Sequence, residues 1–308
     1  MKKYFFPLAI VACTALLNTS CSSSSTEPPV PQEYEGDLPK PTYSEQAVSF
    51  EIASDNVKDK SGKASLKAIN FTESGKAIFE VKTTAGTQFV TYGATTDGDI
   101  YIVTDANGRE IGRLRKLTSR AADDVTIEGT ITVTINGVEY TFTISTKATS
   151  TSVPPTAVSR NTNNLARTWQ VASMNVVLSG DIDLSKLVVG GNLKEFADAA
   201  QEAGANLNAE EMKALSKVVN SMTFNKNGLL SIEYSDASSD GCNWLWASGE
   251  KQEYIRLLQR NGAEFGNKFL SDRSVVKVDF TPTSVALTMK TDIRGSKNYS
   301  ATLTVVLK

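Results

Sequence analysis

The feature that most constrains the fold is a pair of alternating segments on either side of Asn136-Gly137. Apolar residues recur at every second position along both segments: Val125, Ile127, Ile131, Val133 and Ile135, then Val138, Tyr140, Phe142 and Ile144. Asn-Gly is typical of a two-residue type I′ turn, which would pair Ile135 with Val138 and Ile131 with Phe142. The apolar side chains then share one face and threonines line the other. The pattern predicts an antiparallel hairpin with one buried side.

This hairpin belongs to the first of two predicted domains, an antiparallel β-sandwich or barrel over residues 42–147. A second hairpin is predicted at Asn107-Gly108, joining strands at 100–104 and 111–114. Weaker strands are predicted near 48–52, 65–71 and 77–83. The protein is therefore expected to be mainly β.

Residues 148–164, rich in Thr, Ser, Pro and Asn, are predicted to be a linker. The second predicted domain, 165–308, opens with a strand at 168–178 and continues as a meander of short strands. The last strand, 299–307, alternates cleanly between apolar and polar residues. Many short strands joined by short turns are typical of a barrel or sandwich.

Two short helices are predicted within this domain, between its first and second strands. Asn192 and Asn208 each stand three residues before a Glu, the arrangement of a capping box. Phe196 lies on the apolar stripe of the first helix, and Leu215 on that of the second. We expect this pair, over 192–220, to cover one end of the barrel and gate a cavity, or to complete the core.

A faint internal echo links the two domains. Residues 69–75 (INFTESG) resemble residues 222–228 (MTFNKNG): a strand ends in Phe, a polar turn follows, and Gly precedes the next strand. Turn chemistry alone favours Asn, Ser and Gly at such positions. Both chance similarity and common ancestry of the domains are consistent with this echo.

The first 21 residues have the features of a secretory signal: Lys2 and Lys3, an apolar run to Leu17, and small residues before Cys21. This arrangement resembles a bacterial lipoprotein signal. The resemblance implies cleavage after residue 20, an acyl lipid on Cys21, and anchoring to the outer membrane, with the membrane face undetermined. Residues 21–41, rich in Ser and Pro, are predicted to be a flexible tether.

Composition excludes several classes of function. Without Lys2 and Lys3, the 32 basic residues fall to 30 against 34 acidic residues, a net charge of −4, which argues against binding nucleic acid. The chain has no histidine, so it lacks Ser-His-Asp triads and His-ligated zinc. Cys242 is the only thiol of the mature chain besides Cys21, and we interpret it as a small buried hydrophobe. No catalytic residue, metal site or cofactor is predicted.

The segment from Leu165 to Val171 with its Trp169, the following helical insertion and residues 222–229 together resemble the lipocalin-like domains of Bacteroidetes lipoproteins. The Gly of the usual Gly-x-Trp motif is replaced here by Arg167. The resemblance covers about half of the chain. It implies an up-and-down antiparallel barrel with an internal cavity, whose open end is covered by the connection after the first strand.

Trp244 and Trp246 are two apart on a predicted strand and so point to one face. Facing inward they would line a core or cavity, and facing outward they could stack on sugars. Asp236, Asp240 and Asn243 are interpreted as a solvated turn, since they lack the spacing of a calcium loop. The leading hypothesis is a non-catalytic lipoprotein that binds a small apolar or amphipathic ligand through Trp244, Trp246, Phe196 and Leu215. The alternatives are a structural or interaction module, with protein partners unknown, and a glycan-binding protein.

Overall fold

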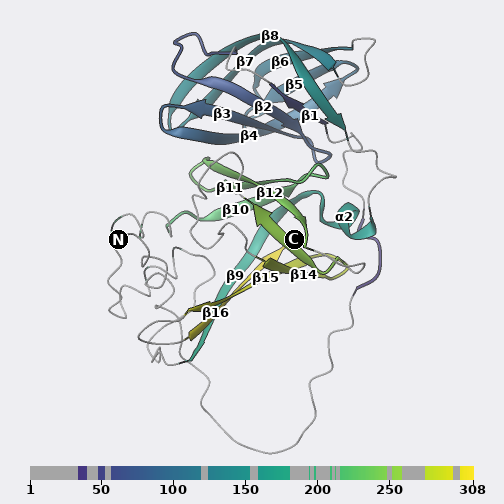
Figure 1. The fold of residues 1–308 in the computed structure, drawn as a ribbon, viewed down its shortest axis with the longest axis vertical. Helices are drawn as coiled ribbons and strands as arrows, with labels where there is room; N and C mark the ends of the chain where they lie inside the picture. The colour runs from purple at the N-terminus through teal and green to yellow at the C-terminus, as the bar shows by residue number, and fades with distance from the viewer. Residues whose placement is uncertain are drawn as a thin grey trace, which may run out of the picture.

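The computed structural model describes residues 34–39, 48–52, 57–118, 124–152, 159–180, 194, 198, 209, 212, 216–247, 252–258, 275–293 and 299–308. Within these residues the chain is mainly β, as predicted, with sixteen antiparallel strands and one short helix, α2 (Arg160–Leu165). None of the described helical segments is long and apolar enough to cross a membrane. The strands form two rings of eight, one above the other in Figure 1.

The first ring is the N-terminal barrel. Its strands are β1 (Val48–Glu51), β2 (Ser65–Phe71), β3 (Lys76–Thr83), β4 (Gly86–Asp97), β5 (Ile100–Thr104), β6 (Glu110–Thr118), β7 (Asp124–Ile135) and β8 (Val138–Ser152). Each strand pairs with the next, and β8 pairs back with β1, which closes the ring. Closure removes the exposed sheet edges that an open sheet would carry.

The second ring is the C-terminal barrel. Its strands are β9 (Thr168–Gly180), β10 (Val219–Phe224), β11 (Leu229–Tyr234), β12 (Ser239–Trp246), β13 (Tyr254–Leu258), β14 (Val275–Phe280), β15 (Val285–Ile293) and β16 (Tyr299–Leu307). Again each strand pairs with the next, and β16 pairs with β9. The predicted meander therefore forms an eight-stranded antiparallel barrel.

Both predicted hairpins are present, and the one at Asn136-Gly137 has the predicted register. Asn136 and Gly137 both adopt positive φ, as a type I′ turn requires, and Ile135 pairs with Val138. At the other hairpin, the carboxylate of Asp105 accepts hydrogen bonds from the backbone N–H groups of Asn107 and Arg109 at 2.9 Å each. Turn residues in the sequence thus identify both hairpins, although the second has a register shift between Val103 and Thr104.

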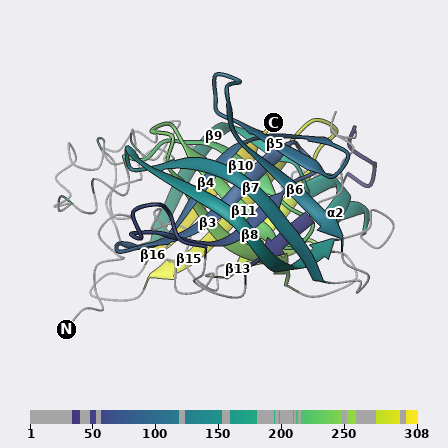
Figure 2. The same cartoon turned by 90° about the horizontal axis from the view of Figure 1, so that it is seen from above.

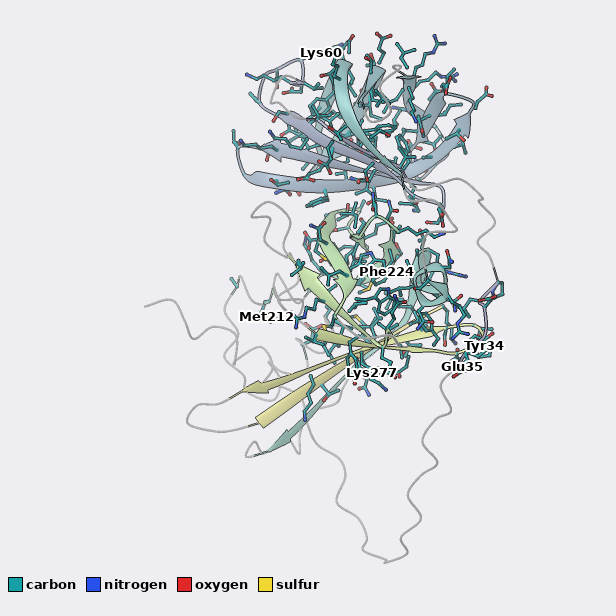
Figure 3. The ribbon with its side chains drawn as sticks, turned by 45° about the vertical axis from the view of Figure 1, so that its right-hand side comes forward. Tyr34, Glu35, Lys60, Met212, Phe224 and Lys277 are labelled. Carbon is teal, nitrogen blue, oxygen red and sulfur yellow. The ribbon has the colours of Figure 1, made fainter. Side chains whose placement is uncertain are left out.

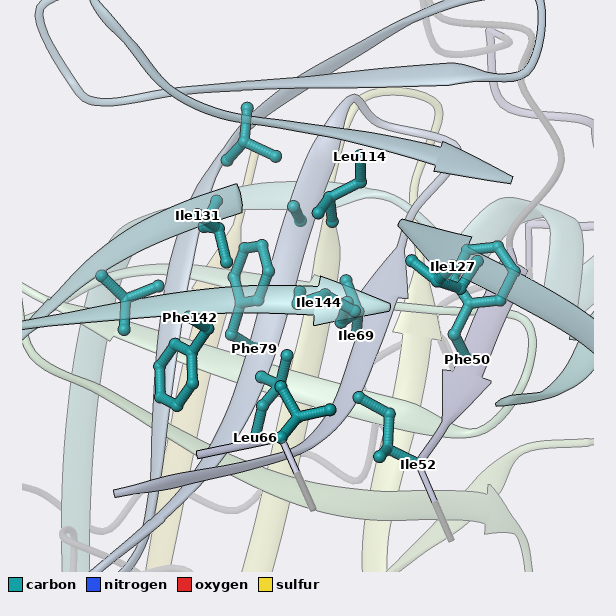
Figure 4. Packing of buried hydrophobic residues seen from close by; sticks show 14 of the residues in the cluster. Phe50, Ile52, Leu66, Ile69, Phe79, Leu114, Ile127, Ile131, Phe142 and Ile144 are labelled. Atoms are coloured by element: carbon teal, nitrogen blue, oxygen red, sulfur yellow. The ribbon is translucent and has the colours of Figure 1, made fainter. Parts of the chain in front are cut away.

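Large apolar side chains fill the N-terminal barrel. Phe79, Phe142 and Ile131 are fully buried and lie within the ring of strands (Figure 4). Phe50 contacts Phe71 edge-to-face, with ring centroids 6.0 Å apart. Of the two predicted architectures, sandwich or barrel, the strand pairing selects the barrel, because inward positions of every strand contribute to one core.

The two-helix insertion predicted over 192–220 is not among the elements whose bounds the structure describes, of which α2 is the only helix. Most of that range lies outside the described residues, although Lys194, Asp198, Ala209 and Met212 are helical. The predicted helix end is wrong, because Val219 already belongs to β10 and pairs with Tyr234. Val219 contributes to the barrel core, which overrides the helical periodicity of the local sequence.

The two barrels follow the same plan in the hairpin that joins their second and third strands, β2–β3 and β10–β11. In the N-terminal barrel, the N–H of Thr72 donates to the carbonyl of Lys76 at 2.8 Å, and Gly75 has φ +69°. In the C-terminal barrel, the N–H of Asn225 donates to the carbonyl of Leu229 at 2.8 Å, and Gly228 has φ +86°. These are the two segments that echo each other in the sequence, and the strand registers extend the equivalence to the paired residues on either side of these hairpins.

Candidate functional site

The interior of the C-terminal barrel is the candidate site, and β12 lines it with four side chains. Asp240, Cys242, Trp244 and Trp246 alternate along the strand, so they share its inner face. Trp244 is 4% exposed and contacts Phe224 edge-to-face at 5.6 Å. Figure 3 shows Phe224 within this half of the molecule.

The two tryptophans are perpendicular rather than coplanar. Their ring centroids lie 5.8 Å apart with planes at 86°. The indole N–H of Trp244 donates to the carbonyl of Asn225 at 3.0 Å, and that of Trp246 to the hydroxyl of Thr162 at 2.8 Å. A sugar platform needs an exposed flat face, which Trp244 does not present, whereas both rings contribute to the barrel interior.

Helix α2 packs against one end of this barrel, here called the α2 end. Ser159 caps the helix by accepting a hydrogen bond from the N–H of Thr162 at 3.1 Å. Leu165 is fully buried in the barrel core, and its carbonyl accepts a hydrogen bond from the indole of Trp169 at 2.9 Å. The α2 end is therefore covered by the segment that joins the two barrels.

Residues 34–39, here called the strap, pack on the same end. The N–H of Leu38 donates to the side-chain oxygen of Asn164 at 2.9 Å, and the amide of Asn164 donates to the carbonyl of Gly36 at 3.0 Å. Leu38 is 5% exposed and belongs to the C-terminal core. The strap belongs to the predicted flexible tether. It binds the C-terminal barrel, although the N-terminal barrel follows it directly in the sequence.

Arg167 joins the strap to the barrel wall. Its guanidinium lies 5.2 Å above the ring of Trp169 and donates to the carbonyl of Pro39 at 2.7 Å. Burial lowers the pKa of Arg167 from its ordinary value. Its Nε has no hydrogen-bond partner among the described residues. Arg167, which stands where the lipocalin-like resemblance would have Gly, therefore contacts both the strap and Trp169.

Polar side chains gather at the opposite end of the barrel, here called the far end. The hydroxyl of Tyr234 donates to the carboxylate of Asp240 at 2.5 Å, and Tyr234 is 2% exposed. The ammonium group of Lys217 lies 4.5 Å from the centre of the Tyr234 ring. Burial, together with the neighbouring carboxylate of Asp240, raises the pKa of Tyr234 well above its ordinary value. The chain between β9 and β10 leaves and re-enters the barrel at this end.

This polar pair has no counterpart in the N-terminal barrel. The positions equivalent to Tyr234 and Asp240 are Val81 and Val90, both buried in an apolar core. A buried polar pair costs free energy relative to two valines unless hydrogen bonding compensates for it. Its presence distinguishes the chemistry of the two interiors.

Cys242 is buried within the C-terminal core and free. Burial, with a further contribution from Asp240, raises the pKa of its thiol far above the ordinary value. The thiolate is the nucleophilic form, so this thiol is unreactive at neutral pH. The interpretation of Cys242 as a buried hydrophobe agrees with this environment.

The other predicted site residues are placed only in part. Cys21, Phe196 and Leu215 lie outside the described residues. Met212, from the predicted second helix, packs against the C-terminal core, and Figure 3 shows it on the opposite side of the barrel from Tyr34. In the described ranges, no group of three or more His, Cys, Asp or Glu residues could hold a metal ion.

The sequence analysis missed several residues of this site. Lys217 and Tyr234 flank two short strands, and no local pattern showed that Tyr234 would face Asp240 across a hairpin. Leu38 is the one strap residue that a sequence signal could have identified, as an apolar side chain within a Pro-rich segment. Asn164 gave no such signal, since Asn is common in linkers.

The two barrels meet over a buried surface, here called the inter-barrel surface. It is formed by outward-facing residues of both halves: Ser49, Asn70, Glu73, Ser74, Lys76, Ile78, Phe89 and Thr91 on the N-terminal side, and Thr168, Thr223, Asn225, Lys226, Asn227, Leu229, Ser231, Glu233, Ser239 and Gly241 on the C-terminal side. Seen from above, the N-terminal ring covers the C-terminal half (Figure 2).

Apolar and polar contacts alternate across this surface. Ile78, Phe89 and Leu229 form a separate apolar cluster. The hydroxyls of Thr91 and Ser231 are 2.8 Å apart. Gly241 has no side chain because a Cβ there would lie 2.4 Å from the Phe89 ring. Packing this close predicts that the stabilities of the two barrels are coupled.

Comparisons with known proteins give no family for the chain. No family model matches it, and no curated protein matches it. A porin-like protein from Bacteroides uniformis, known from its crystal structure, is 8% identical, with 89% of this chain and 100% of that chain covered and a TM-score of 0.19. A TM-score of that size carries no argument about the fold or function of this protein. The structure itself defines the class: a tandem pair of eight-stranded antiparallel barrels.

Proposed function

We propose that this protein is a non-catalytic, lipid-anchored lipoprotein of the outer membrane whose C-terminal barrel binds a small amphipathic ligand. The lipocalin-like resemblance of this half leads to the same proposal. The supporting observation is the Tyr234–Asp240 pair, which lies 2.5 Å apart on the inner face where the N-terminal barrel has two valines. A barrel that served only as a filled scaffold gains nothing from a buried polar pair.

The ends of the barrel differ in a way that fits ligand entry. The α2 end is covered by α2 and the strap, through Leu165 and Leu38. The far end carries the polar pair and receives Met212 from the chain between β9 and β10. An amphipathic molecule entering there would place its polar group near Tyr234 and its apolar part toward Phe224 and Trp244. The predicted gate residues Phe196 and Leu215 belong to the same connection.

A binding experiment on the chain from Ser22 onwards tests this proposal. The neutral fluorescent probe N-phenyl-1-naphthylamine should bind saturably, with one site per molecule. Phe196→Glu and Leu215→Glu should weaken binding at least about tenfold, which corresponds to about 1.4 kcal/mol. Val138→Glu, at an exposed position of the N-terminal barrel, is the matched control and should leave binding unchanged.

The role of the polar pair is tested by making the C-terminal interior resemble the N-terminal one. The variant Tyr234→Val/Asp240→Val should keep affinity for the neutral probe and lose discrimination between a neutral and a charged C12 amphiphile. Absence of saturable probe binding, together with no small molecule in native mass spectra of the purified protein, would contradict the proposal.

Anchoring is tested separately. Cys21→Ser should abolish acylation and leave the protein unprocessed or released from the membrane fraction. Unchanged fractionation and mass in that variant would contradict the lipid anchor while leaving ligand binding untouched.

A structural module of an envelope assembly is the second candidate function. The observation that favours it is the fully filled N-terminal core, in which Phe79, Phe142 and Ile131 are completely buried. A filled barrel offers stability and an outer surface rather than an internal site. The binding experiment distinguishes the two, because a scaffold would bind the probe neither saturably nor at one site.

A further inference from the structure

Two polar contacts between the barrels are related by exchange of one barrel for the other. Ser49 is the equivalent of Thr168, and Ser74 is the equivalent of Asn227, since each holds the same register relative to the matched hairpins. The hydroxyls of Ser74 and Thr168 are 2.7 Å apart, and the amide of Asn227 donates to the hydroxyl of Ser49. When each residue is replaced by its equivalent in the other barrel, one of these contacts becomes the other.

Equivalent residues also interact within each barrel, next to the inter-barrel surface. The hydroxyl of Ser49 donates to the amide oxygen of Asn70 at 2.6 Å. The equivalent residues Thr168 and Thr223 have hydroxyl oxygens 2.9 Å apart. Each barrel therefore presents the same short row of hydrogen-bonding side chains to its neighbour.

Two contacts join a residue to its own equivalent. Phe89 pairs with Ser239, the residue that occupies the same place in β12 as Phe89 does in β4. Glu73 forms an ion pair with its equivalent, Lys226, at 2.8 Å. Contacts between equivalent positions arise on a two-fold axis, as in the isologous interface of a symmetric dimer.

We infer that the chain is an internal dimer of a duplicated barrel, and that the Glu73–Lys226 pair specifies pairing of its two unlike halves. The occupant of each docking surface is the other barrel of the same chain. Pairing of two N-terminal barrels would place Glu73 against Glu73, and pairing of two C-terminal barrels would place Lys226 against Lys226. The side chains of Lys226 and Glu73 are only 5% and 14% exposed, so like charges there would be poorly solvated.

An internal dimer favours common ancestry over chance similarity as the origin of the echo between residues 69–75 and 222–228. Turn chemistry explains a shared Gly, but it does not place the two turns against each other across a two-fold axis. The internal dimer is independent of the proposed ligand, since it rests on the outer faces of the barrels.

Charge reversal on the folded chain tests the inference. A protease site is inserted between Thr156 and Ala157 in the chain from Ser22 onwards, and the folded protein is cut there. The wild-type halves should remain associated in size-exclusion chromatography. Lys226→Glu or Glu73→Lys should weaken association more than about 100-fold, as expected when a buried pair is broken. The double swap Glu73→Lys/Lys226→Glu should restore it to within about tenfold of wild type.

The exposed pair Glu110–Arg113 provides the matched control, and its reversal should leave association unchanged. The strap is present in every variant, so its contribution to association is constant. If a single reversal fails to fold, recovery of folding in the double swap supports the inference and persistent misfolding overturns it. Failure of the double swap to restore association also overturns it.

The duplication is tested by two double-mutant cycles on the intact chain. Ser74→Ala with Thr168→Ala, and Ser49→Ala with Asn227→Ala, remove exchange-related contacts. The two cycles should give couplings of the same sign and similar size. A coupling in one cycle and none in the other would overturn the two-fold equivalence.

Discussion

The two barrels of this protein share a strand plan and differ in what fills them. Inward positions that hold Val81, Val90 and Ala94 in the N-terminal barrel hold Tyr234, Asp240 and Trp244 in the C-terminal barrel. Barrel closure depends on the backbone ladder and on alternation, both of which tolerate such changes. Two barrels with the same strand plan can therefore enclose interiors of different chemistry.

The ends of the barrels differ as well. The N-terminal barrel encloses its own core, whereas the C-terminal barrel recruits Leu38 from the strap and Leu165 from α2. Segments before the first barrel and between the barrels therefore serve the second one.

Truncation of the N-terminal core tests whether the barrels unfold together. Phe79→Ala should lower the free energy of unfolding by about 3–5 kcal/mol, because this side chain is completely buried. The inter-barrel surface predicts one cooperative transition, measured by urea denaturation with near-ultraviolet circular dichroism. Independent folding of residues 42–147 and 165–308, which a linker at 148–164 would allow, would instead give two transitions.

Crowding the inter-barrel surface tests the same coupling from outside the cores. Gly241→Val should cost about 1–3 kcal/mol, since its Cβ would lie 2.4 Å from the Phe89 ring. Leu245→Ala, at an exposed position of the same strand, is the control and should change stability little. Equal stability of the two variants in thermal unfolding would mean that the surface is dispensable.

The polar pair gives a pH dependence that the N-terminal barrel lacks. The pKa of Tyr234 is raised by burial and then by Asp240, so its contribution to stability is complete below the ordinary tyrosine pKa of about 10 and is lost as the pH rises through the folded-state pKa. Tyr234→Phe should therefore show a shallower loss of stability above about pH 10 than the wild type. Parallel curves for the two proteins would contradict a buried, neutral Tyr234.

The smallest effect is expected at the exposed ion pair of the N-terminal barrel. Glu110 and Arg113 form two hydrogen bonds, at 3.0 and 2.8 Å, on the protein surface. Solvent and salt screen such pairs, so Glu110→Gln should leave the unfolding midpoint unchanged within error. A midpoint shift as large as that of Lys226→Glu would remove the distinction between the exposed pair and the pair on the two-fold axis.

Strand order followed from the sequence where turn residues and alternation agreed. Asn136-Gly137 predicted the longest hairpin, and the cross-strand pair Ile131–Phe142 has the predicted register. The apolar stripe predicted for the second helix was wrong at Val219, which lies in β10. An apolar residue near the end of a barrel is equally suited to a helix and to a strand. Local periodicity cannot choose between them when tertiary pairing supplies the deciding free energy.

The candidate site was predictable only in part. Alternation placed Trp244 and Trp246 on one face of a strand, and the structure assigns that face to the barrel interior. The contact of Tyr234 with Asp240, and the docking of Leu38 onto Asn164, join residues whose relation appears only after the chain has folded.

The β class, the register of the Asn136-Gly137 hairpin and the resemblance between the turns at residues 69–75 and 222–228 could be predicted from the sequence, because these depend on local backbone preferences and on a two-residue period. The tertiary structure decided that each set of eight strands closes, that the strap serves the C-terminal barrel, and that Glu73 meets Lys226. Those outcomes depend on contacts between residues about a hundred or more positions apart, whose free energies have no local signature in the chain.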